Sequence, residues 1–350
     1  MTSRELVIHT LCHHPVERIA RQLDIFPGLE LVQKDDVEEM CFRYPSDIQE
    51  PDFQYPQGKR SRGSPDRLGQ FTDAWGCVWE VKELGKPAQL VDSPLVDLAA
   101  AVSYKPPKKL FEKLSPEQVN RSCAATSRFV LARTDVRPFE RLQFLHGAEA
   151  TRVDLACGNR AIRDLLQMVH ECYLQEIQWW AHTQVDGVCF RDAWGTAEGL
   201  VLSADLWRDL FKPLYRQYCQ ILRKQDKYVF FESAGNLTAI LEDLVEIGVD
   251  AVECDLGGLN LQDLASRFEG KITFWGGNPT EVLLRGTPAD CRQWVGRIRQ
   301  ALDHGRGGLI GKCLWDGRMT FENVANLMET WTQSLRLVLK ALGGGATASP

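Results

Sequence analysis

The fold is decided by residues 185–236, which read VDGVCFRDAWGTAEGLVLSADLWRDLFKPLYRQYCQILRKQDKYVFFESAGN. Two short apolar runs in this stretch each end on a carboxylate, Asp192 and Glu232. Each carboxylate is followed by a loop that contains glycine, and the first loop leads into a helical pattern. This alternation of strand, loop and helix is typical of a parallel α/β fold. We therefore expect the two carboxylates to point into a shared mouth.

The same rhythm continues through the second half of the chain. Residues 250–256, 272–278 and 307–314 are predicted to be the next three strands. In parallel barrels the active site lies where the strands end and the loops begin. One candidate site is therefore predicted from the residues at these ends, which are Asp192, Glu232, Glu253 or Asp255, Trp275 to Asn278, and Cys313.

Length and composition favour one large domain. The chain has 350 residues, of which 44% are hydrophobic, and this is enough for a single large core. We expect one domain over 1–342, with a cap and loop excursion in 1–120, a main barrel in 121–342 and a flexible tail in 343–350. Residues 127–136 are predicted as the first barrel strand. The polar segment 33–75 is predicted to be a surface excursion or a loop over the mouth.

Charge and cysteine spacing exclude several classes of protein. A net charge of −6 leaves no basic footprint for nucleic acid. No apolar run approaches the ~18 residues of a membrane helix, and the N-terminus lacks a signal-peptide core, so a cytoplasmic location is predicted. Eleven cysteines occur without the spacing of a metal finger or redox motif. Most are expected to be free and buried, and Cys313 is the exception worth testing.

Several short motifs occur along the chain in a specific order. They are Thr2-Ser3-Arg4-Glu5, Gly147-Ala148-Glu149, Asp192 to Gly199, Leu206-Trp207, Lys212-Pro213, Ser233-Ala234-Gly235-Asn236, Ile247-Gly248-Val249-Asp250, Trp275-Gly276-Gly277 and Glu322-Asn323. In these motifs the chain resembles the uroporphyrinogen decarboxylase-like superfamily, and within it the corrinoid-dependent methyltransferases. The resemblance implies a (β/α)8 TIM barrel with an N-terminal helical or loop extension. It also implies methyl transfer from a small donor to the Co(I) corrinoid, a cobalamin, of a small partner protein.

The decarboxylases of this superfamily provide the second hypothesis. They carry an N-terminal motif, Met-Arg-Gln-Ala-Gly-Arg, that binds the carboxylates of a tetrapyrrole, and this chain lacks it. A substrate with many carboxylates needs several convergent arginines, for which Arg133 and Arg191 are candidates. A lyase acting on a carboxylated substrate stays as the alternative. A non-catalytic barrel is the third possibility, and a homodimer is left open.

The resemblance also raises the question of zinc. Superfamily members that activate thiols bind zinc through a His-x-Cys pair and a cysteine on the last strand. Cys313 stands ten residues before Asn323, as that last cysteine does, but Glu232 and Ala234 replace the first pair. Zinc bound by Glu232, Cys313 and a further carboxylate such as Glu253 or Asp192 is one interpretation.

A metal-free site is the second interpretation. A purely structural role for Glu232 and Cys313 is the third. In the metal-free case Glu232 is a general acid, with its pKa raised by Phe230, Phe231 and the like charge of Asp192. The missing thiol-site ligands argue against a thiol as methyl acceptor and favour O-demethylation of an aromatic methyl ether. Departure of the phenolate would gain from a proton donor or a Lewis acid.

Side chains in predicted loops and strand ends are the candidates for binding the donor. Flat tryptophan rings can enclose an aromatic ring, and polar side chains can bond its oxygen. The predicted set is Trp75, His146, Glu149, Trp194, Trp275 and Asn278.

Overall fold

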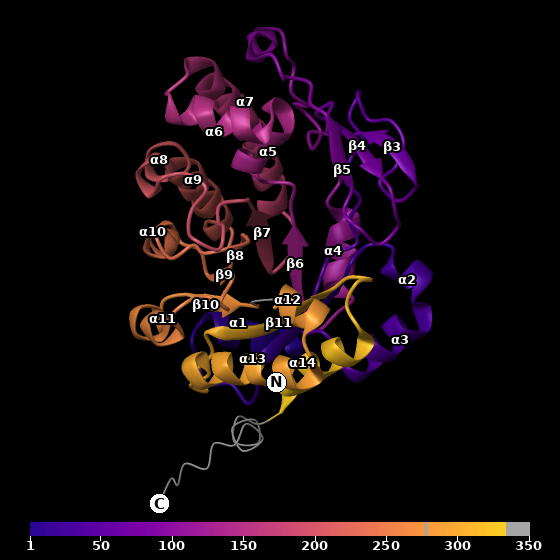
Figure 1. Cartoon of the computed structure of the whole chain (residues 1–350), viewed down its shortest axis with the longest axis vertical. Helices are drawn as coiled ribbons and strands as arrows, with labels where there is room; N and C mark the ends of the chain where they lie inside the picture. Colours follow the sequence, from indigo (N-terminus) through magenta and orange to yellow (C-terminus); the bar gives the residue numbers. More distant parts are fainter. Residues whose placement is uncertain (277–278, 334–350) are drawn as a thin grey trace, which may run out of the picture. The chain divides into compact units, whose positions relative to one another are not determined.

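The structure, a computed structural model, describes residues 1–276 and 279–333. The chain divides into two compact units. Unit 1 contains Met1–Gln49, Ser127–Phe129 and Asp250–Pro350, and unit 2 contains Glu50–Thr126 and Val130–Val249. Asn278 and the predicted tail 343–350 lie outside the described residues. Each unit combines parallel strands with helices (Figure 1), which confirms the predicted α/β class.

Unit 1 is built on four neighbouring parallel strands, in the order β1 (Ala20–Ile25), β11 (Leu309–Trp315), β10 (Thr273–Trp275) and β9 (Ala251–Glu253). Its helices are α1 (Ser3–Leu11), α2 (Leu29–Val32), α3 (Lys34–Arg43), α11 (Leu261–Phe268), α12 (Thr280–Arg285), α13 (Pro288–Leu302) and α14 (Phe321–Thr332). The short strand β2 (Ile48–Gln49) also belongs to this unit. Helices α13 and α14 pack side by side, and α14 also packs on β11 (Figure 1).

Strand β1 corrects the predicted organisation of the N-terminal segment. The prediction places the first barrel strand at 127–136, yet Ala20–Ile25 pairs in parallel with β11, from Ala20 opposite Ile310 to Ile25 opposite Trp315. Its residues ARQLDI do not alternate cleanly, because Gln22 is buried in the core as well as Leu23. A strand that buries a polar side chain does not show the pattern of apolar residues that predicts a strand.

Unit 2 contains the parallel strands β8 (Tyr228–Glu232), β7 (Gly187–Arg191) and β6 (Phe129–Arg133), although Phe129 itself falls in unit 1. Its helices are α4 (Glu117–Ala124), α5 (Pro138–His146), α6 (Ala148–Ala156), α7 (Arg160–Ala181), α8 (Ala204–Leu210), α9 (Lys212–Arg223) and α10 (Leu241–Ile247), with a 3-10 turn at Leu98–Val102. Helix α7 packs against α5, α6 and α9. An antiparallel sheet is formed by β3 (Gly69–Thr72), β4 (Val78–Val81) and β5 (Gln89–Asp92).

The loops after β7 and β8 touch through two glycines. A Cβ on Gly235 would lie 2.3 Å from the carbonyl carbon of Gly195, and a Cβ on Gly195 would lie 2.4 Å from the carbonyl oxygen of Ala234. Gly235 also has a φ of +78°, which disfavours any side chain. Asn236 N donates to Thr196 O across the same contact, at 2.8 Å. The glycines of the stretch that decides the fold therefore lock these two loops together.

The cysteines are mostly buried, as the sequence predicts. All eleven cysteines are free, and eight of them are buried. Among the described helices, none is long and apolar enough to cross a membrane.

Candidate functional site

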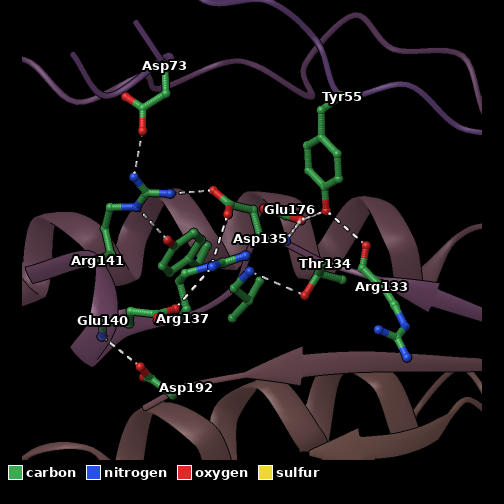
Figure 2. Close-up of polar contacts among 12 residues, drawn as sticks. Tyr55, Asp73, Arg133, Thr134, Asp135, Arg137, Glu140, Arg141, Glu176 and Asp192 are labelled. Atoms are coloured by element: carbon green, nitrogen blue, oxygen red, sulfur yellow. Dashed lines mark hydrogen bonds and ion pairs between the residues drawn. The ribbon is translucent and has the colours of Figure 1, made fainter. Parts of the chain in front are cut away.

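Charged and polar side chains gather at the carboxyl end of β6 in unit 2 (Figure 2). Asp135 follows the strand, Arg141 comes from α5, and Glu176 comes from α7. Segments that precede β6 in the chain add Tyr55 and Asp73. We call this group the β6 cluster, and its members are Tyr55, Asp73, Asp135, Arg141, Tyr173 and Glu176.

Arg141 is the centre of the cluster. Its side chain is only 4% exposed, and it donates to Asp73 Oδ2 at 3.0 Å, to Asp135 Oδ2 at 2.7 Å and to the Tyr173 hydroxyl at 3.1 Å. The guanidinium also lies over the Trp75 ring, 4.9 Å from its centroid. A buried arginine with this many directed bonds fixes the position of both aspartates.

Asp135 and its neighbour Glu176 have pKa values that move in opposite directions. Burial alone would raise the pKa of Asp135, but Arg141 and Arg137 hold it below its ordinary value. Burial, together with the negative charge of Asp135, raises the pKa of Glu176 to about 7. Neighbouring carboxyls whose pKa values are driven apart are typical of acid and base sites.

Tyr55 connects Glu176 to solvent. Its hydroxyl donates to Glu176 Oε1 at 2.7 Å, and the residue is 41% exposed. Even so, burial by surrounding groups raises the pKa of Tyr55 well above its ordinary value, so this accessible side chain lies in a recess. A pocket of about 30 Å³ adjoins it, lined by residues that include Tyr55, Trp75, Asp135 and Glu176. That volume holds about two water molecules.

Arg191 ends β7 in the same unit, opposite Glu232 in the strand register. The side chain is exposed, and within the described part of the chain its guanidinium makes no hydrogen bond or ion pair. Although the residue is exposed, the protein groups around its guanidinium partly withdraw it from water, and this burial, with the like charge of Arg137, lowers its pKa, whereas Glu232 raises it. The guanidinium is therefore accessible to an anionic ligand atom.

Glu232, predicted as general acid or zinc ligand, ends β8 and is 23% exposed. Its Oε2 lies 3.6 Å from Nη1 of Arg133, so the two side chains form an ion pair. The apolar neighbours on which the prediction relied, Phe230 and Phe231, are fully buried. The ion pair gives Glu232 a cation to position, while its roles as general acid or zinc ligand stay predictions.

Asp192, the other predicted catalytic residue, caps helix α5. It is 3% exposed, and its carboxylate accepts from Phe139 N at 2.7 Å, Glu140 N at 2.6 Å and the Tyr215 hydroxyl at 2.6 Å. Those two backbone groups lie in the first turn of the helix, where an anion is stabilised. Burial raises the pKa of Asp192 to about 7, and the Tyr215 bond opposes this shift. Its position gives it a clear structural task, while its catalytic role stays a prediction.

The three predicted tryptophans are buried, with exposed fractions of 4% for Trp75, 0% for Trp194 and 1% for Trp275. Trp194 stacks on Phe139 at 4.3 Å, and Trp75 lines the small pocket in unit 2. Trp275 belongs to unit 1, where its Nε1 donates to Gln22. Packing is the evident role of Trp194 and Trp275, and Trp75 has access to a described pocket.

His146 and Glu149 lie away from the β6 cluster. His146 is the last residue of α5, so it sits at the opposite end of the helix from Asp192, a distance of about 12 Å along the axis. Its buried ring bonds to Leu95 O and Asp154 Oδ2, both at 2.8 Å. Glu149 is exposed in the first turn of α6. Neither residue therefore faces the charged group at β6.

The remaining predicted zinc ligands lie in unit 1. Cys313 is fully buried on β11, and burial raises the pKa of its thiol. Glu253 forms an ion pair with Lys312, whose Nζ lies 3.7 Å from Asp24 and 4.0 Å from the Trp275 ring centroid. Zinc needs a thiolate and carboxylate oxygens that are free to coordinate. These donors do not fit it, and the described residues contain no group of three His, Cys, Asp or Glu placed to hold a metal ion.

Sequence reasoning missed Tyr55, Arg141, Glu176 and Lys312. Glu176 carried a detectable signal, because it interrupts the apolar face of α7 between Tyr173 and Trp180. A charged residue on the buried face of an amphipathic helix needs a partner. Lys312 carried the same kind of signal inside the apolar strand β11.

Comparison with known proteins places the chain in a family. The sequence profile of uroporphyrinogen decarboxylase (URO-D) matches residues 138–332, more than half of the chain. The chain belongs to the uroporphyrinogen decarboxylase family. Its fold is accordingly the (β/α)8 barrel that the motifs predicted, and Asp135, Arg191, Asp192 and Glu232 lie at or directly after the carboxyl ends of barrel strands. No curated protein matches the sequence.

Solved structures agree with this fold. A methyltransferase from Methanosarcina mazei matches with a TM-score of 0.68 and 12% identity, over 95% of this chain and 98% of that one. A family 10 endo-β-1,4-xylanase from Gloeophyllum trabeum has a TM-score of 0.38 at 10% identity, over 61% and 79% of the two chains. The chitinase ChiB from Flavobacterium johnsoniae has a TM-score of 0.34 at 9% identity, over 90% and 94%. The last two scores are too low to support an argument.

Proposed function

We propose that this family member is a methyltransferase that moves the methyl group of an aromatic methyl ether to the corrinoid of a partner protein. Membership of the family and a barrel like that of a methyltransferase support an enzyme of this general kind. The observation that carries the proposal is Arg191, an accessible guanidinium at the end of β7 beside the strand-end carboxylate Glu232. A site of this kind can receive the negative charge of a departing oxygen.

The proposed methyl transfer requires this chain to stabilise the departing oxygen. When bound, the reduced corrinoid of the partner supplies the nucleophile for the methyl carbon. The ether oxygen then leaves as a phenolate, whose conjugate acid has a pKa of about 10, as tyrosine does. Donors aimed at an oxygen on which charge develops lower the barrier, and each is worth about 10²–10³ in kcat. Arg191 is suited to this task, and Glu232, fixed by Arg133, is suited to orienting Arg191.

The test is methyl transfer from 2-methoxyphenol to free Co(I) cobalamin, followed by the change in cobalamin absorbance and by catechol release. We expect turnover by the wild type and a loss of about 10²-fold in kcat for Arg191→Gln. Arg160→Gln is the matched control, because that arginine is 94% exposed on the outer surface of α7. If no methyl ether supports transfer by the wild type, the proposed function is wrong.

A lyase acting on a carboxylated substrate remains the second candidate, because four arginines come together around β6 and β7. Three of them are already committed to carboxylates of the protein: Arg133 to Glu232, Arg137 to Asp135 and Arg141 to Asp73 and Asp135. One accessible guanidinium can hold one carboxylate, whereas a tetrapyrrole with many carboxylates needs several. Release of CO2 from uroporphyrinogen, without methyl transfer, would favour the lyase.

A further inference from the structure

Glu176 is a buried carboxyl for which the reaction proposed above gives no role. It projects from α7 and is 3% exposed. Three titratable groups face it from three different elements: Tyr55 from the segment before β3, Asp135 from the loop after β6, and Tyr218 from α9. Hydrogen bonds from Tyr55, Asp135 N and Trp180 lower its pKa, but burial and the negative charge of Asp135 outweigh them. The neutral acid is therefore the form that this location favours.

Asp135 lies next to Glu176 but favours the opposite protonation state. It is the neighbour of Glu176 in space, and its backbone N donates to Glu176 Oε1 at 3.1 Å. The Asp135 carboxylate, however, accepts from Arg141 at 2.7 Å and lies 3.1 Å from Nε of Arg137. Two cations thus hold Asp135 ionised, while its charge in turn keeps Glu176 protonated.

Tyr55 provides a path for the Glu176 proton towards solvent. Its hydroxyl is 2.7 Å from Glu176 Oε1 and 3.3 Å from the backbone oxygen of Arg133, the last residue of β6. Tyr55 is 41% exposed to solvent, whereas the Glu176 carboxyl to which it bonds is buried. When Glu176 carries its proton, that proton can be donated to the Tyr55 oxygen, which frees the Tyr55 hydrogen to point elsewhere.

We infer that Glu176 and Tyr55 form a proton relay that protonates the departing oxygen of the methyl donor. This inference rests on the proposed function, to which it adds a proton donor for the departing oxygen. The bond between the methyl carbon and the oxygen breaks, and its electron pair stays on the oxygen. Tyr55 passes its hydroxyl proton to that oxygen and takes the proton of Glu176. The resulting Glu176 carboxylate is reprotonated from water before the next turnover.

The first experiment compares Glu176→Gln and Tyr55→Phe with the wild type in the assay with 2-methoxyphenol and free Co(I) cobalamin. Each variant should lose about 10²-fold or more in kcat, with a smaller change in KM, as expected for loss of a general acid. A second tyrosine–glutamate hydrogen bond supplies the controls, since the Tyr44 hydroxyl is 3.4 Å from Glu329 Oε2 in unit 1. Tyr44→Phe and Glu329→Gln should keep the wild-type kcat.

The leaving group separates a relay from a merely structural role. With 4-nitromethoxybenzene as donor, the departing phenolate is far more stable and needs no proton, so both variants should recover to within a few fold of the wild type. The wild-type kcat with 2-methoxyphenol should also fall as the pH rises through about 7, and this fall should be missing in Glu176→Gln. Equal losses with both donors would overturn the relay.

A measurement without turnover distinguishes this inference from the proposed function. In protein labelled with ¹³C at the glutamate carboxyls, one carboxyl resonance should titrate near pH 7 and disappear in Glu176→Gln. Absence of that resonance overturns the relay whatever the activity. If the resonance is present but no methyl ether reacts, the proposed function fails, and with it the assignment of the relay to an ether oxygen.

Discussion

Arg141 in unit 2 and Lys312 in unit 1 are two buried cations in similar surroundings. Each is less than 5% exposed, lies between two carboxylates and packs over a tryptophan ring. The partners differ in access to solvent: Asp73 and Asp135 are 19% and 31% exposed, whereas Asp24 and Glu253 are each 15% exposed. The ion pairs of Lys312 are therefore more enclosed, whereas Arg141 lies beside the recess that Tyr55 lines.

The two cations also differ in chemistry. The arginine fork makes separate directed bonds to Asp73, Asp135 and Tyr173, and it helps to hold the pKa of Asp135 below its ordinary value. Lysine is a compact point charge that neutralises both of its neighbours without orienting them. The comparison suggests that the Arg141 region is arranged to control a proton, and that the Lys312 region is arranged to hold unit 1 together.

Lys312→Met gives the largest expected effect on stability. The substitution leaves Glu253 and Asp24 buried without their cation, a change that typically costs about 3–5 kcal/mol. The free energy of unfolding, measured by urea titration at pH 7, should fall by this amount. Lys271→Met, at an exposed position of the same unit, should stay within about 0.5 kcal/mol of the wild type. A similar small loss for Lys312→Met would show that the ion pair is not what stabilises unit 1.

The second prediction concerns the pH dependence of stability in unit 2. The pKa of Glu176 is raised from 4.5 to about 7 in the folded protein, so the folded state binds the proton more tightly than the unfolded state. Its stabilising contribution is therefore complete below pH 4.5 and is lost as the pH rises through about 7. The shift corresponds to about 3 kcal/mol. Urea titrations between pH 4.5 and 8 should show this loss in the wild type.

Glu176→Gln should make that pH profile flatter. The slope should not vanish, because burial also raises the pKa of Asp192 to about 7 and gives a contribution of the same sign. Glu329→Gln should leave the wild-type slope unchanged. An identical slope in Glu176→Gln and the wild type would mean that Glu176 is ionised throughout, like Asp135.

The parts of the molecule that the sequence predicts are formed by residues close together in the chain, and the parts that it does not predict are formed by residues far apart. The strands that end near Asp192 and Glu232 follow from local patterns, and they appear as β7 and β8. The β6 cluster joins Tyr55 to Glu176, 121 residues apart, and Asp73 to Arg141, 68 residues apart. Hydrophobic periodicity carries no information about which distant charges meet.

The predicted chemistry at Glu232 shows the same limit. Its place at a strand end follows from the sequence, but its ion pair with Arg133 depends on two strands with β7 between them. The sequence shows that Phe230 and Phe231 precede Glu232 in the strand, but it does not show that Arg133 lies beside it. Assigning acid and base roles requires the complete set of neighbouring charges, and that set is a property of the fold.

Asp24→Asn is the smallest expected effect and sharpens the account of Lys312. The Asp24 carboxylate is 3.7 Å from Nζ, farther than Glu253, and its Oδ1 accepts from Gln22 Nε2 at 2.7 Å. An asparagine oxygen can keep that hydrogen bond, so urea unfolding should show a loss of only about 1 kcal/mol. Glu253→Gln, which removes the nearer charge, should cost more. The reverse order would make Asp24 the main counter-charge and would place the centre of this polar core on β1 instead of β9.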